Sequence, residues 1–118
     1  MDHLALAVSN QGRSRRFYER YFGFTAEPTP RSDGVLMLHS GEFSLALGET
    51  TEPISLPTFL HFGRGLPSPD EVRSFHLRLV ADGVEIVGMW DEPDYVSVKF
   101  CDPDGYIVEV GWEPDAAD

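Results

Sequence analysis

The apolar and polar positions of the chain form a pattern that occurs twice. An apolar run of strand length surrounds His3, a second surrounds His61, and each is followed by a segment of helical periodicity. The two helical segments carry Phe17 and Phe75. His61 follows His3 by 58 residues, and Phe75 follows Phe17 by the same interval. With the strands expected after each helix, the pattern predicts two copies of one unit built from a strand, a helix and three strands.

Both predicted helices have clear boundaries. In the second copy Ser68 is a suitable N-cap, Pro69 suits the first turn, and Glu71 completes a capping box. Gly83 is suited to the left-handed residue that ends a helix. The apolar face of this helix is formed by Val72, Phe75 and Leu79. The first helix is expected from about Ser9 or Asn10 to Gly23, with Phe17, Tyr18, Tyr21 and Phe22 packed inward.

The segment between the copies contains two prolines and little periodicity, which indicates a linker. We therefore predict a single domain over residues 1–118, with module one at about 1–50, the linker at about 51–57 and module two at about 58–113.

The last two strands of the second copy alternate with a period of two, so their residues are assigned to opposite faces of a sheet. Tyr95, Ser97 and Lys99 are predicted to share the face of Glu109, while Val96, Val98 and Phe100 suit the face covered by a helix. A carboxylate among apolar neighbours needs a partner, because burying an unpaired charge costs several kcal/mol. A divalent cation would be such a partner.

His3, His61 and Glu109 are the best candidates for that cation. The histidines occupy matching places at the start of each copy, and Glu109 lies on the final strand of the second. When Gly41 is aligned with Gly105, Leu45 takes the place of Glu109 in the first copy. His39 and His76 lack this symmetry and are interpreted as ordinary core or surface residues.

Composition narrows the class of protein. Twenty acidic and nine basic residues give a formal charge of −11, so nucleic acid and anionic membrane surfaces are not expected as partners. The single cysteine, Cys101, permits no internal disulfide and no cysteine-based metal motif. Because no apolar run approaches the roughly 18 residues of a spanning helix and no signal segment follows Met1, we expect a cytoplasmic protein.

Three segments together resemble the vicinal oxygen chelate superfamily, which includes glyoxalase I, extradiol dioxygenases and the fosfomycin and bleomycin resistance proteins. They are Asp-His-Leu-Ala-Leu-Ala-Val at the start, the Arg-Phe-Tyr helix ending in Phe-Gly-Phe, and Asp-Pro-Asp-Gly-Tyr-Ile-Val-Glu-Val near the end. The resemblance covers roughly residues 2–113. It implies an α+β fold in which two βαβββ modules form a cupped, mostly antiparallel sheet around a metal.

In that superfamily the ligands lie on the first and last strands of each module, which here implies His3, Leu45, His61 and Glu109. Three of these positions carry ligands and Leu45 does not. Two imidazoles and one carboxylate suit Fe(II) or Mn(II) and are compatible with Zn(II) or Ni(II). Glyoxalase I uses a fourth ligand, whereas the fosfomycin-modifying and extradiol-cleaving members use three.

The resulting prediction is a divalent-metal-dependent enzyme of the dioxygenase, transferase or lyase type that acts on a small oxygen-chelating substrate. Glu109 would act through the metal, and Ser97, Lys99 and Tyr95 would contact the substrate. A bleomycin-resistance-like protein that binds a drug or another small molecule without chemistry is the alternative. The resemblance also implies a homodimer, and the cup is free to close within one chain or between two.

Overall fold

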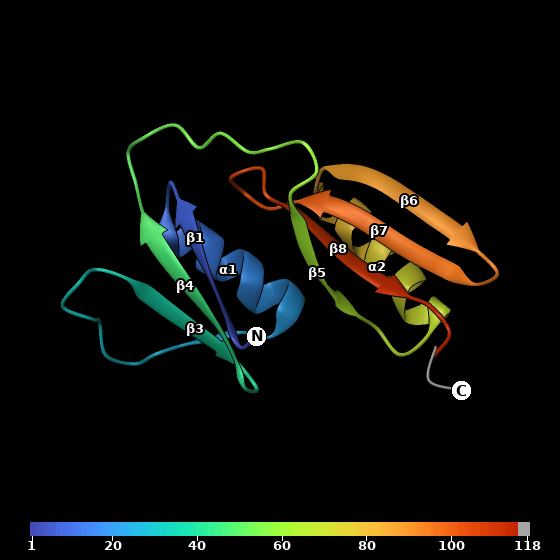
Figure 1. Cartoon of the computed structure of the whole chain (residues 1–118), viewed down its shortest axis with the longest axis horizontal. Helices are drawn as coiled ribbons and strands as arrows, with labels where there is room; N and C mark the ends of the chain where they lie inside the picture. The colour runs from blue at the N-terminus through green and yellow to red at the C-terminus, as the bar shows by residue number, and fades with distance from the viewer. Residues whose placement is uncertain (116–118) are drawn as a thin grey trace. The chain divides into compact units, whose positions relative to one another are not determined.

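Figure 1 shows the computed structural model of the chain, which describes residues 1–115. The chain divides into two compact units, Met1–Ser55 and a second that begins at Leu56. Each unit has the order strand, helix and three strands, so the predicted βαβββ repeat is confirmed. Among the described residues no helix is both long and apolar enough to cross a membrane.

The first unit is a sheet of four strands packed against one helix. Strand β1 pairs in parallel with β4, while β4 with β3 and β3 with β2 are antiparallel, so the strand order is β1-β4-β3-β2. The helix packs against β3 and β4 over buried side chains that include Leu38 and Leu45. The elements are β1 (His3–Val8), α1 (Gln11–Phe22), β2 (Thr25–Ala26), β3 (Leu36–Ser40) and β4 (Phe43–Glu49).

The second unit repeats this topology with the strand order β5-β8-β7-β6. Strand β5 is parallel to β8, and the other two pairs are antiparallel. Helix α2 packs against β7 and β8, and Figure 1 shows it behind these strands. The elements are β5 (His61–Gly65), α2 (Pro69–Ala81), β6 (Ile86–Glu92), β7 (Tyr95–Cys101) and β8 (Ile107–Trp112).

Both helices begin where the sequence predicts, and each is capped by a side chain. The side chain of Asn10 accepts a hydrogen bond from Arg13 N, and that of Ser68 accepts one from Glu71 N, so each satisfies a backbone donor of the first turn. Helix α1 ends at Gly23, which has a φ of 67° that glycine adopts without steric cost.

Strand alternation gives β7 one face buried against α2 and an opposite face that carries polar side chains. In β7, Val96, Val98 and Phe100 are fully buried on the side of α2, and the Phe100 ring packs against Phe75. Tyr95 and Ser97 lie on the opposite face, where both contact Glu109. The predicted alternation is therefore confirmed, and the chemistry-bearing residues of the second unit share the face opposite α2.

Candidate functional site

His61 and Glu109 lie side by side on two parallel strands. His61 opens β5, and Glu109 is the register partner of Gly63, two residues further along the same strand. The two side chains share the face opposite α2, with His61 Nε2 3.7 Å from Glu109 Oε1. This distance is longer than a hydrogen bond but shorter than twice the length of a metal–ligand bond, which is about 2.1 Å. Both atoms can therefore bind one ion.

The Glu109 carboxylate is held through its other oxygen. Tyr95 donates a hydrogen bond to Oε2 at 2.6 Å, and Ser97 donates one to the same atom. Partial burial raises the pKa of Glu109, but these two hydrogen bonds and the nearby Lys99 and His61 outweigh it and hold the pKa below its usual value. Glu109 is therefore ionised at neutral pH, with Oε1 facing His61.

Local acceptors fix the orientation of both candidate histidine ligands. His61 Nδ1 lies 2.9 Å from the carbonyl oxygen of Phe59, and His3 Nδ1 lies 2.7 Å from Asp2 Oδ1. Carbonyl and ionised carboxylate oxygens only accept hydrogen bonds, so Nδ1 carries the proton in each ring. The lone pair of each neutral ring is then on Nε2, as in histidines oriented by a second contact for metal binding.

A hollow of about 510 Å³ surrounds His61 and Glu109 on the second unit. Tyr95 and Trp112 contribute aromatic surface to its lining, and Arg64, Glu113 and Asp115 contribute charge. Of the predicted substrate contacts, only Tyr95 lines this hollow. Ser97 has no exposed surface, and its hydroxyl donates to Glu109, so the structure supports a role in orienting that carboxylate.

Lys99 lies on the same face and is held by aromatic rings. Its ammonium nitrogen is 5.2 Å from the centre of the Trp90 ring and 5.9 Å from that of Phe59, distances typical of cation–π contacts. Lys99 is also the register partner of Glu109 on the neighbouring strand. Its positive charge thus lies beside the site, but it does not line the hollow.

The position equivalent to Glu109 in the first unit is Ala46, which corrects the prediction for Leu45. His3 is paired with Ser44 as His61 is paired with Ile107, so Ala46 matches Glu109 by register. Leu45 is 2% exposed, on the face covered by α1. Alignment on the glycines failed because the two hairpins differ in length: two residues join β3 to β4, whereas five join β7 to β8. The alignment is therefore shifted by one residue, and a shift of one residue moves a side chain to the other face of the sheet.

The sequence analysis did not identify the groups that orient the candidate ligands. Asp2 precedes His3 directly, and this adjacency was the available signal for their contact. The Phe59 carbonyl, like any backbone group, left no signal in the sequence. Gly63 was also missed: a Cβ there would collide with the carbonyl of Glu109, so glycine allows β5 to approach β8 at the site.

His3 belongs to the first unit, and its side chain is 74% exposed. Within residues 1–115 the structure contains no group of three or more histidine, cysteine, aspartate or glutamate side chains placed to hold a metal ion. The pair formed by His61 and Glu109 has the donor types, orientation and spacing that fit a divalent cation. The complete set with His3 stays a prediction.

A comparison with family models identifies the chain. The model of the Glyoxalase/Bleomycin resistance protein/Dioxygenase superfamily matches residues 1–110. The chain belongs to this superfamily. No curated protein matches the chain.

Solved structures share the fold. A possible glyoxalase from Bacillus cereus is 28% identical, with a TM-score of 0.77, and the match covers 93% of this chain and 96% of that one. The fosfomycin resistance protein FosX from Listeria monocytogenes is 18% identical, with a TM-score of 0.81 and coverage of 97% and 93%. Lactoylglutathione lyase from Agrobacterium tumefaciens is 22% identical, with a TM-score of 0.73 and coverage of 95% and 92%.

Proposed function

We propose that this superfamily member is a divalent-metal-dependent enzyme that acts on a small substrate with two neighbouring oxygen atoms. The observation that carries the proposal is the geometry of His61 and Glu109, whose Nε2 and Oε1 atoms face one another at 3.7 Å on adjacent strands. His3, with its Nδ1 held by Asp2, is the proposed third ligand. Fe(II), Mn(II), Zn(II) and Ni(II) all accept two imidazoles and one carboxylate.

Each residue of the site has a distinct part in this proposal. A bound divalent cation supplies a Lewis acid that stabilises negative charge on a substrate oxygen. Tyr95 and Ser97 hold the Glu109 carboxylate in position, which reduces the reorganisation needed to bind the ion. Lys99 supplies positive charge next to Glu109 for an anionic substrate group. With alanine at position 46, the first unit lacks the carboxylate that a four-ligand site would use.

The proposed chemistry is therefore of the dioxygenase, transferase or lyase type that needs three protein ligands. The Listeria protein that shares this fold is a fosfomycin resistance protein, and the Agrobacterium protein is a lyase. Both names agree with small-molecule chemistry on this fold, although fold alone does not determine the reaction.

Metal analysis tests the proposal directly. Protein purified without chelator or nickel resin should contain close to one divalent ion per complete site by elemental mass spectrometry. His61→Ala and Glu109→Gln should lose the ion, whereas His76→Gln, which changes a helix α2 residue outside the set, should keep it. Full metal content in both ligand variants would contradict the proposal.

One observation favours a second candidate, a protein that binds a cationic small molecule without chemistry. The carboxylates of Glu109, Glu113 and Asp115 and the ring of Trp112 line the same hollow, and such surroundings attract a cationic ligand with an aromatic group. Calorimetry with metal-free protein separates the two functions. Tight binding of bleomycin without metal supports sequestration, whereas small-molecule binding that requires the metal supports the enzyme.

A further inference from the structure

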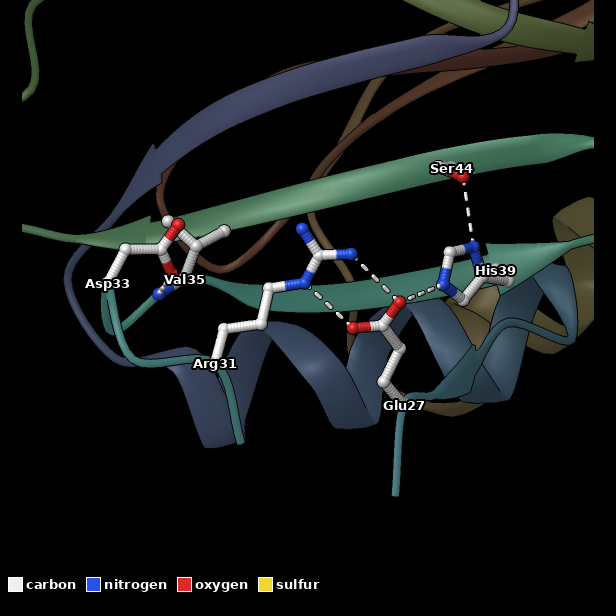
Figure 2. Close-up of polar contacts among 6 residues, drawn as sticks. All are labelled: Glu27, Arg31, Asp33, Val35, His39 and Ser44. Atoms are coloured by element: carbon white, nitrogen blue, oxygen red, sulfur yellow. Dashed lines mark hydrogen bonds and ion pairs between the residues drawn. The ribbon is translucent and has the colours of Figure 1, made fainter. Parts of the chain in front are cut away.

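The first unit contains a second polar cluster, formed by residues other than the proposed ligands. It consists of Glu27, Arg31, His39 and Ser44, which Figure 2 shows joined by a continuous series of polar contacts. His39 lies on β3 and Ser44 on β4, and the two are register partners. Their strand neighbours Leu38 and Leu45 are buried towards α1, so the cluster lies on the opposite face of the sheet.

The hydrogen bonds of the cluster have a defined direction. His39 Nε2 is 2.8 Å from Glu27 Oε2, and because an ionised carboxylate only accepts, Nε2 carries the proton. In the neutral ring Nδ1 then holds the lone pair. Ser44 Oγ lies 2.9 Å from Nδ1, so the serine hydroxyl donates its hydrogen to the imidazole.

Glu27 is held in its charged form at the far end of this series. Arg31 donates two hydrogen bonds to it, from Nε at 2.8 Å and from Nη2 at 3.0 Å. These bonds, and to a smaller extent the contact with His39, lower the pKa of Glu27 to about 2. The carboxylate thus stays negative over the neutral range and accepts the N–H of His39 Nε2.

We propose that Ser44 is an activated nucleophile, with His39 as its general base and Glu27 as the carboxylate that orients and stabilises the imidazole. The three residue types, their contact order and the direction of both hydrogen bonds match the roles in a serine–histidine–acid triad. The ring is turned, so that Nδ1 faces the hydroxyl and Nε2 faces the carboxylate. Ser44 is half-buried and 39% of the His39 side chain is exposed, so a small reagent has access.

The substrate class is an activated carboxylic ester. Ser44 Oγ attacks the carbonyl carbon as its proton moves to His39 Nδ1. The bond from that carbon to the alcohol oxygen then breaks, and the proton passes from Nδ1 to the departing alcohol. Water attacks the acyl-serine by the same proton route, which releases the carboxylic acid and restores Ser44. Water is the one co-reactant and no metal enters this sequence, so the proposal does not rest on the pair formed by His61 and Glu109.

A fluorophosphonate probe tests the proposal on metal-free, full-length protein. Intact-mass and peptide mass spectrometry should locate the label on Ser44, and Ser44→Ala should abolish it. His39→Gln and Glu27→Gln should slow labelling, the former by about a hundredfold, the scale of a positioned general base. Ser55→Ala and His76→Gln are matched controls with an exposed serine and a histidine outside the cluster, and both should label at the wild-type rate. Labelling elsewhere, or an unchanged rate in His39→Gln, would overturn the proposal.

A second variant tests the proposal even if His39→Gln disturbs the fold. Ser44→Cys places a thiol beside the same imidazole, and it should react with iodoacetamide much faster than Cys101 in the same chain. Burial, and to a smaller extent the nearby Glu85, raises the pKa of Cys101. Its thiol should therefore react slowly with iodoacetamide and serves as an internal standard. Equal rates at the two cysteines would show that His39 does not activate position 44.

Discussion

Gly63 and Glu109 face each other across β5 and β8 so closely that a side chain at position 63 would collide with the Glu109 carbonyl group. Gly63→Ala should force the strands apart and separate His61 from Glu109. We expect a loss of about 1–3 kcal/mol in the free energy of unfolding, typical of overpacking, together with weaker metal binding. Denaturant titration and metal titration measure the two effects.

Gly65→Ala is the matched control, because a Cβ there meets only the Gly111 carbonyl oxygen at 4.0 Å. It should leave both quantities close to their wild-type values. Equal effects at positions 63 and 65 would refute a special role for the close approach at Glu109.

Ala46, rather than Leu45, is the position at which a fourth ligand belongs. Ala46→Glu should place a carboxylate on the face opposite α1, in the position that Glu109 holds in the second unit, and should tighten metal binding. Leu45→Glu should bury a charge in the core and cost several kcal/mol of stability. Thermal unfolding and metal titration of both variants test the register, and a stable Leu45→Glu protein would contradict it.

Glu109→Gln should weaken metal binding and activity together, because a neutral amide is a poorer ligand than a carboxylate. Tyr95→Phe removes a hydrogen bond to that carboxylate and should weaken metal affinity by about tenfold or more. Glu92→Gln changes an exposed carboxylate on β6 and serves as the control. A Glu109→Gln protein that kept its metal but lost turnover would indicate direct proton transfer by Glu109.

Stability should depend on pH through Glu27. Its pKa is about 2 in the folded protein, against 4.5 for an ordinary glutamate. The folded state therefore binds this proton less tightly, so the charged carboxylate stabilises the fold above about pH 4.5 and the contribution disappears as the pH falls towards 2. Glu27→Gln should lower the free energy of unfolding at neutral pH, and the difference from wild type should shrink in acid.

Glu19→Gln provides the comparison for this pH dependence, because Glu19 forms an exposed pair with Arg15. Its effect should be small at every pH. Denaturant titrations across the acid range measure the free energy of unfolding of both variants as a function of pH. The same pH dependence in both variants would rule out a special contribution from Glu27.

A homodimer is expected in solution, as the family resemblance implies. Light scattering at micromolar concentration should give a mass of about twice the 13.2 kDa of one chain. A particle of 13.2 kDa alone would refute the dimer and favour closure of the proposed metal site within one chain.

The sequence predicted the fold well because its signals are local. Ser68 caps the second helix as expected, the first helix begins after Asn10 as expected, and Val96 and Val98 lie on the buried face that their alternation assigns. The second unit of the site was predicted in part: His61 and Glu109 do lie together. Leu45 was misplaced because hairpin length decides strand register, and a glycine alignment does not report that length.

Contacts between side chains distant in the sequence were the hardest to predict. His39 was interpreted as an ordinary residue because Glu27 and Ser44 lie on different strands or loops, and only pairing of β3 with β4 brings the group together. Ser97 was predicted as a substrate contact from its face of the strand and from the family resemblance. Its complete burial under Glu109 depends on packing that alternation does not describe.

Each helix covers the sheet of its own unit, and the buried side chains of each sheet lie against that helix. Each unit therefore has an interior of its own, and the connection from residue 50 to 60 contains no helix or strand. Exchange of a whole unit between two chains would leave both interiors intact and would require only that this connection change direction. Insertions or circular permutation at the same connection should for that reason be tolerated far better than cuts inside either unit.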